Sequence, residues 1–319
     1  MLKKLGLILL FLIVLFCTGL YFLTNKILAM VKEFEPYTFE RVLEDPAMAE
    51  DYGIGSARNP GDYGFNFEEI SFKSYLDSLE LSAWYINSAP MSNKSIVLVH
   101  GRTSNRLKTM KYLELFDNTG LDTLYNFLII DCRNSGKSPN ATTYMGYKFA
   151  EDIRGGINYL QKIQSQDTVV IYGFSMGAMA IGTMVDRADL DLGSIVLEKV
   201  ILDSPLANAM ENLRLRSTEM GLPNIIFENI YGKFSDEIGG YGTKLRLSIL
   251  LAESEFPILI VQSNDDTSTP ARFTKQELEL LGPKQNIQTW FMDGPQHVDI
   301  YAAEQYKQEY EKRISEFIR

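Results

Sequence analysis

One short pattern in this chain of 319 residues restricts its fold more than any other, the G-x-S-x-G of residues 173–177. It follows the apolar run 169–172 and precedes a run of small residues, so it joins an expected strand to an expected helix. A sharp turn of this kind strains the backbone of the central serine and leaves no room for side chains two positions away, which accounts for Gly173 and Gly177. The turn also lifts the serine oxygen above the sheet. Ser175 is therefore the predicted nucleophile.

A serine nucleophile needs a base, and the chain contains only two histidines. His297 lies in a turn-rich loop directly after the strand-like run 287–291, near the C-terminus and downstream of Ser175. This position favours His297 as the base, with an ordinary surface histidine as the alternative. His100 ends the strand-like run 95–99 and leads into a loop, so we interpret it as a structural histidine that shapes an oxyanion loop.

The acid of such a site is expected between the serine and the histidine. The apolar run 257–262 leads to two adjacent aspartates, Asp265 and Asp266. Asp266 is preferred because it precedes Pro270 by four residues, a spacing common among proteins with this pattern, and Asp265 is the second choice. Asp203, at the end of another apolar run, fits a variant geometry. The carboxylate would bind the Nδ1 proton of the imidazole and stabilise the imidazolium, a mechanism that needs no metal or cofactor.

The order of the candidate nucleophile, acid and base, Ser175, Asp266 and His297, resembles that of the α/β-hydrolase superfamily. The resemblance covers roughly residues 60–319. Two further motifs carry it: the His-Gly pair at 100–101 is similar to the oxyanion motif of the family, and residues 131–138 are similar to its D-x-R-x-x-G-x-S loop.

Within the superfamily, the segment 60–85 is similar to membrane-anchored bacterial hydrolases related to serine aminopeptidase-like enzymes and lipases. The resemblance implies that the backbone amides of Arg102 and Met176 form the oxyanion hole. Arg102 departs from the aromatic or small residue often found there. Two alternatives stay open for its guanidinium: contact with an acidic group of the substrate, or solvent.

The hydrophobic pattern predicts an α/β fold with a mainly parallel sheet, because strand-like and helix-like runs alternate along the chain. Ligands of such sheets bind outside the carboxyl ends of the strands, where Ser175, Asp266 and His297 would all emerge. Helical spacing is expected at 105–117, 144–163, 176–185, 274–281 and 302–318. The eight expected strands lie near residues 66–74, 79–87, 95–100, 126–131, 168–174, 198–203, 257–263 and 286–292.

One segment, 206–255, is longer than an ordinary crossover between two strands and is expected to form a helical lid over the site. It mixes aromatic and aliphatic residues with scattered arginine and lysine. Such a lid favours an acyl or other largely apolar substrate. Packing of the same apolar residues onto the body is the alternative.

The N-terminus predicts a membrane anchor, since residues 5–25 carry no charge and are long enough to span a bilayer. Lys3 and Lys4 precede this segment as in a signal sequence. A retained signal anchor is preferred, and cleavage near residues 17–19 is the alternative. With the two lysines in the cytoplasm, the hydrolase domain is expected on the outer side.

Three regions follow: an anchor at 1–30, a mostly polar and partly helical tether at 31–59, and a hydrolase domain at 60–319 with its lid insertion at about 206–255. The net charge of −10 argues against a nucleic-acid partner. The two cysteines lie in the anchor and in a loop, so a disulfide is not expected. Oligomeric state stays open.

The sequence therefore predicts a membrane-anchored serine hydrolase that cleaves carboxyl esters or thioesters of small-molecule or lipid-like acyl substrates through an acyl-enzyme. Peptide or amide cleavage is the second hypothesis, because the same three residues serve both reactions. A binding protein that keeps the fold without turnover is the third. The presence of serine, histidine and both elbow glycines argues against that third hypothesis.

Overall fold

A sheet of eight strands lies at the centre of the computed structural model, which describes residues 2–319. Its spatial order is β1-β2-β4-β3-β5-β6-β7-β8. β2 pairs antiparallel with β1 and β4, and the other pairings are parallel. Each strand lies within two residues of its predicted ends, and the predicted fold class is confirmed. The strands are β1 Glu68–Lys73, β2 Glu80–Ile86, β3 Lys94–Val99, β4 Asn126–Ile130, β5 Thr168–Phe174, β6 Val196–Asp203, β7 Ile258–Ser263 and β8 Ile287–Met292.

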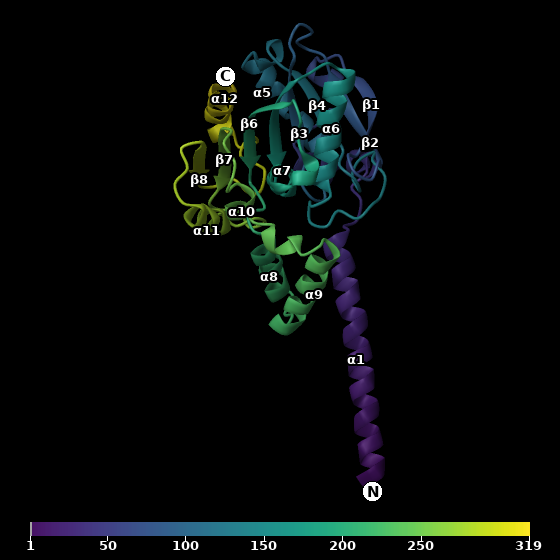
Figure 1. The fold of residues 1–319 in the computed structure, drawn as a ribbon. Coiled ribbons are helices and arrows are strands. Elements are labelled where there is room, and N and C mark those ends of the chain that lie inside the picture. The colour runs from purple at the N-terminus through teal and green to yellow at the C-terminus, as the bar shows by residue number, and fades with distance from the viewer. Residues whose placement is uncertain (1) are drawn as a thin grey trace.

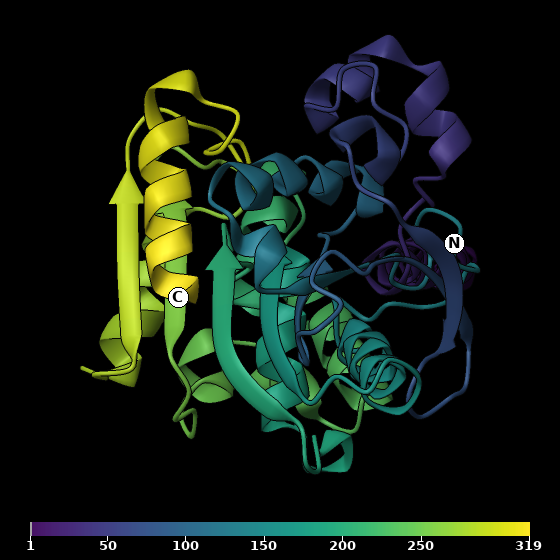
Figure 2. The ribbon, with the colours of Figure 1, turned by 90° about the horizontal axis from the view of Figure 1, so that it is seen from above.

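Helices cover both faces of the sheet (Figures 1 and 2). Successive side chains of a strand point to opposite faces, so Val97 and Val99 of β3 join the core under α6 and α7, while Ile96 and Leu98 join the core under α4, α5 and α12. Burial on both faces explains why the central strands are continuous apolar runs. The helices are α4 Arg106–Met110, α5 Tyr112–Asn118, α6 Phe149–Ile163, α7 Met176–Asp186, α11 Ala271–Leu281 and α12 Glu304–Ile318, with short 3₁₀ turns at Pro60–Tyr63, Leu121–Thr123 and Ala188–Leu190.

The long connection after β6 is helical, as predicted, and consists of α8 (Ala209–Glu219), α9 (Asn224–Glu237), the 3₁₀ turn η4 (Tyr241–Lys244) and α10 (Leu247–Leu250). Figure 1 shows α8 and α9 extending from the body beside the upper part of α1. Phe227, Ile230 and Phe234 are buried in the main core cluster. These three side chains therefore serve packing, the alternative that the sequence left open, whereas Met220 and Ile225 of the same insertion are exposed.

Residues 31–59, expected to be a tether, pack onto the body instead. They form α2 (Phe39–Glu44) and α3 (Pro46–Tyr52). Phe34 is buried in one core cluster, and Phe39, Val42 and Tyr52 are buried in the other. The segment is mostly polar, as expected, but its few apolar side chains are buried among residues that are distant in sequence, and no local pattern reveals such packing.

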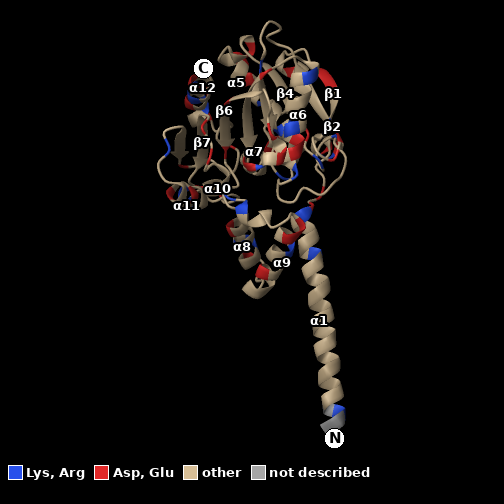
Figure 3. Cartoon of the chain, in the orientation of Figure 1, with Lys and Arg blue, Asp and Glu red and all other residues tan. Residues whose placement is uncertain are grey.

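Helix α1 spans Leu2–Lys32, two residues beyond the expected anchor, and projects from the body (Figure 1). Residues 6–32 are apolar and long enough to cross a membrane. Residues 5–25 carry no charge, so most of this helix is tan in Figure 3, and large apolar side chains at residues 7–16 are exposed. α1 thus has the properties of a membrane anchor or of a signal sequence.

Candidate active site

The nucleophile candidate lies at the turn between β5 and α7. Ser175 has φ 54° and ψ −118°, a strained conformation for a residue with a side chain. A Cβ at Gly177 would lie 2.6 Å from the carbonyl oxygen of Val99, and one at Gly173 would lie 2.9 Å from the backbone nitrogen of Ala178. These approaches are too close for a methyl group, so the flanking glycines have the steric reason that the pattern predicts.

Ser175, His297 and Asp266 form a continuous chain of hydrogen bonds. His297 Nε2 lies 2.8 Å from Ser175 Oγ, and its Nδ1 lies 2.7 Å from Asp266 Oδ2. The other carboxylate oxygen of Asp266 accepts the backbone N–H groups of Ser268 and Thr269, both at 2.8 Å. With the Asp266 carboxylate accepting at Nδ1, the neutral imidazole presents an unprotonated Nε2 to the serine hydroxyl.

The other two candidate carboxylates have different partners. Asp265 is exposed and accepts the Gly294 backbone N–H at 2.6 Å. Asp203 is buried, and its carboxylate accepts hydrogen bonds from the hydroxyls of Tyr310 and Ser204. Burial raises the pKa of Asp203 to about 6. Neither carboxylate contacts the imidazole, so the geometry favours Asp266.

His100 is held by two backbone groups. Its Nε2 accepts the N–H of Cys132 at 3.0 Å, so Nδ1 carries the proton and donates it to the Gly101 carbonyl at 2.7 Å. The ring is fully buried, and this burial lowers the pKa of His100. A neutral histidine fixed in this way shapes the loop of residues 100–105, which we term the oxyanion loop.

The oxyanion loop passes directly over the nucleophile. A Cβ on Gly101 would lie only 2.9 Å from the Cβ of Ser175, so glycine permits this approach. Met176 begins α7, and its backbone N–H therefore has no partner within the helix. The amides of Arg102 and Met176 thus lie on the two segments that approach Ser175, as an oxyanion hole requires.

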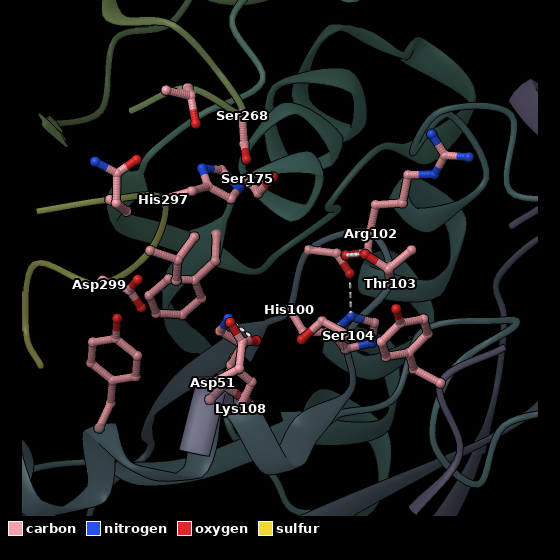
Figure 4. A pocket seen from close by; sticks show the side chains of 18 residues that line it. Asp51, His100, Arg102, Thr103, Ser104, Lys108, Ser175, Ser268, His297 and Asp299 are labelled. Carbon is pink, nitrogen blue, oxygen red and sulfur yellow. Dashed lines mark hydrogen bonds and ion pairs between the residues drawn. The ribbon is translucent and has the colours of Figure 1, made fainter. Parts of the chain in front are cut away.

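The Arg102 side chain follows neither alternative drawn from the sequence. Its Nη2 donates to the backbone carbonyl of Met30 at 2.6 Å, near the end of α1. Its guanidinium also lies over the ring of Phe34, 5.5 Å from the centroid. Figure 4 shows the guanidinium directed away from Ser175 and His297.

The D-x-R-x-x-G-x-S loop after β4 supports the oxyanion loop from behind. Asp131 Oδ1 accepts the N–H of Arg106 at 2.8 Å, and Oδ2 accepts the N–H of Lys137 at 3.0 Å. Gly136 has φ 58° and lies against this carboxylate, where a side chain would overlap it. Ser138 donates to the Asp131 carbonyl at 2.7 Å. The motif is therefore structural, and it fixes the start of α4 next to the loop.

A cavity of about 340 Å³ opens beside Ser175 and His297, as Figure 4 shows. Most of its side chains are polar, including Lys108, which pairs with Asp51 at 3.1 Å, and Asp299. Sequence reasoning missed Tyr37, Asp51 and Lys108, because the first two belong to the segment expected as a tether. Among residues 2–319, we find no group of three His, Cys, Asp or Glu side chains placed to hold a metal ion.

The insertion reaches the site through the loop that carries Asp266. Asn212 of α8 donates to the Ser268 carbonyl at 2.8 Å, and Arg216 donates to the Thr267 carbonyl at 2.8 Å. The cavity lining includes no residue of 206–255 within the described part of the chain. The insertion therefore holds the acid loop from outside, and its role as a lid stays a prediction.

An eight-stranded α/β sheet with a serine at the strand-to-helix turn defines the class of protein, and comparison with known proteins agrees with it. A family model described as alpha/beta hydrolase fold matches residues 94–230. A Bacillus subtilis protein, the uncharacterized YqkD, is 30% identical over 229 residues, which is 70% of each chain. The chain belongs to the α/β-hydrolase fold family.

Solved structures show the same fold. The Pyrococcus furiosus esterase Pf2001 superposes with a TM-score of 0.63 at 22% identity, covering 82% of this chain and 93% of that one. A putative aryl esterase from Burkholderia cenocepacia has a TM-score of 0.56 at 16% identity, covering 79% and 98%. At these identities the likeness concerns the fold.

Proposed function

We propose that this protein is a serine hydrolase that cleaves carboxyl esters through an acyl-enzyme. The observation that carries the proposal is the hydrogen-bonded chain from Ser175 Oγ through His297 to Asp266 at the strained turn. The α/β-hydrolase fold hosts many unrelated functions, so only the geometry of this site supports the proposed activity.

In the proposed reaction, Ser175 Oγ attacks the ester carbonyl while His297 Nε2 takes the hydroxyl proton. The amides of Arg102 and Met176 stabilise the oxyanion of the tetrahedral intermediate. His297 then gives the proton to the leaving alcohol, and the acyl group stays on Ser175. A water molecule, deprotonated by His297, attacks the acyl-enzyme, and His297 returns the proton to Ser175 Oγ as the acid is released.

The cavity favours a short or polar acyl group. Its volume is about 340 Å³, at the lower end of the range for small-molecule sites, and charged side chains such as Lys108 and Asp299 line it. A long alkyl chain would place apolar surface against these charges. The cavity therefore favours a smaller and more polar acyl group than the largely apolar substrate expected from the sequence.

The test is hydrolysis of p-nitrophenyl esters from acetate to palmitate by the full-length protein in detergent. Turnover should be highest for the shortest esters and should be lost in Ser175→Ala and His297→Ala. Ser56→Ala is the matched control, because Ser56 is exposed and outside the cavity. Activity that survives in Ser175→Ala would overturn the proposal, as would a folded wild-type protein that neither hydrolyses any ester nor reacts with a fluorophosphonate.

We also propose that α1 is retained as a membrane anchor with the body on the outer side. The support is the length and apolarity of residues 6–32 and the position of Lys3 and Lys4 before them. Intact mass of the membrane-extracted protein tests retention, since cleavage would remove the first residues. Orientation is tested by adding protease to cells whose α1-containing membrane is intact and accessible from outside. The protease should then degrade the body.

A further inference from the structure

We propose that the end of α1 is part of the active-site structure, because Arg102 ties the oxyanion loop to it and thereby acts as a positioning residue. The inference rests on the proposed function and extends it. It assigns the Arg102 side chain a role that differs from that of its backbone amide.

The C-terminal end of α1 packs on the body and does not lead into a free linker. Leu28, Val31 and Phe34 are buried in the main core cluster. The Lys32 carbonyl accepts the backbone N–H of Thr143 at 2.8 Å, as well as the Thr143 hydroxyl at 3.0 Å. Residues 28–34 are therefore a fixed surface against which a loop can be held.

A hydrogen bond joins Arg102 to this surface. The carbonyl of Met30 belongs to the last turn of α1, where carbonyl groups have no donor within the helix. Arg102 Nη2 supplies that donor at 2.6 Å, and a cation is favoured at the negative end of a helix. The ring of Phe34 under the guanidinium adds a cation–π contact.

The oxyanion loop has a strained backbone that contacts with the segment 30–37 can hold in place. Thr103 has φ 51°, which is uncommon for a β-branched residue. Its hydroxyl donates to the Arg102 carbonyl at 2.7 Å. A second tie lies at the other end of the loop, where Asn105 donates to the Tyr37 carbonyl at 2.7 Å. The segment 30–37 therefore holds the oxyanion loop at Arg102 and at Asn105.

The consequence for catalysis follows from geometry. The amide of Arg102 is useful only if it points at the oxyanion, and a displacement of about 1 Å in such a group can cost on the order of 100-fold in rate. Removing an oxyanion donor altogether costs about 100- to 1,000-fold in kcat. Loss of the Met30 contact should therefore lower kcat, and the Michaelis constant should change little because the guanidinium points away from Ser175 and His297.

The experiment compares Arg102→Met and Arg102→Lys in the full-length protein. Methionine keeps an apolar stem over Phe34 but cannot donate, and lysine restores one charged donor. Arg58→Ala is the matched control, because Arg58 also donates to backbone carbonyls, at 3.0 and 3.3 Å, and is exposed outside the cavity. The readouts are kcat, the Michaelis constant, and amide hydrogen exchange of residues 101–105.

We expect Arg102→Met to lower kcat about 10- to 100-fold, with the Michaelis constant within about threefold, and to speed exchange in the loop. Arg102→Lys should recover part of the lost kcat and part of the lost protection from exchange, and Arg58→Ala should match the wild type. Unchanged kcat and unchanged exchange would overturn the inference, and so would a raised Michaelis constant at unchanged kcat, which would indicate substrate binding. A folded wild type with neither turnover nor fluorophosphonate labelling would refute the proposed function, whereas the exchange measurement would still test the contact between Arg102 and Met30.

Discussion

Replacing Asp266 by asparagine should disable the site by reversing one hydrogen bond. Asp266 Oδ1 already accepts two backbone N–H groups, those of Ser268 and Thr269. In the variant, only the amide oxygen can take that place, so the amide NH₂ must face His297 Nδ1. The imidazole must then accept at Nδ1 and carry its proton on Nε2, where the Ser175 hydroxyl now finds a donor and no base.

The expected loss in kcat is about 10⁴-fold, as for the same change in other triads, which equals about 5.5 kcal/mol of transition-state stabilisation. The fold should persist because the side chain keeps its size and its two backbone bonds. The assay is hydrolysis of p-nitrophenyl acetate by full-length Asp266→Asn. A ¹⁵N imidazole spectrum should show the change of tautomer, and its interpretation is simple because the chain has only two histidines.

Asp265→Asn is the matched control, since it makes the same chemical change at the neighbouring residue. Asp265 is exposed, and among the described residues its carboxylate accepts only the Gly294 N–H, so activity should stay within about threefold of the wild type. The reasoning would be refuted if Asp266→Asn kept more than a tenth of the wild-type kcat, or if Asp265→Asn were the more damaging change.

Three further changes concern stability. Because burial raises the pKa of Asp203 to about 6, the folded state binds more protons than the unfolded state between about pH 4 and pH 6. The free energy of unfolding should therefore fall by about 3 kcal/mol as the pH rises through this window. Denaturant titrations at several pH values should show a smaller fall in Asp203→Asn. Arg133→Met leaves the buried Asp152 without its ion pair, formed at 2.7 Å, and should cost about 3–5 kcal/mol in the same titrations. Gly177→Ala forces a methyl group against backbone carbonyls and should cost about 3 kcal/mol or more, seen as a lowered melting temperature.

The strands and the three hydrogen-bonded residues were predictable because their signals are local. A buried parallel strand must be apolar along its whole length, as Ile96–Val99 is. The turn at Ser175 requires glycine at fixed offsets, and a chain with two histidines leaves little choice of base. Each residue was marked by its immediate neighbours in the sequence, and the order of the three along the chain related them to one another.

The cavity was not predictable in this way. Tyr37 and Asp51 reach it from a segment whose buried side chains, such as Phe39, are too few to give a periodic pattern. The Arg102–Met30 bond joins positions 72 residues apart. The insertion illustrates the opposite problem, because its apolar residues are as consistent with packing as with a substrate pocket, and only the three-dimensional arrangement separates the two.

The direction of the strands relative to α1 has a consequence for how substrates arrive. Figure 2 looks along α1, and the strands run across that view. Apart from Tyr37 and Asp51, the residues that line the cavity lie at or after the carboxyl ends of β3, β5, β7 and β8. If α1 stands upright in a bilayer, the mouth of the site faces sideways, parallel to the membrane surface. A substrate would then enter from the side, at a height above the bilayer that is fixed by where α1 leaves it.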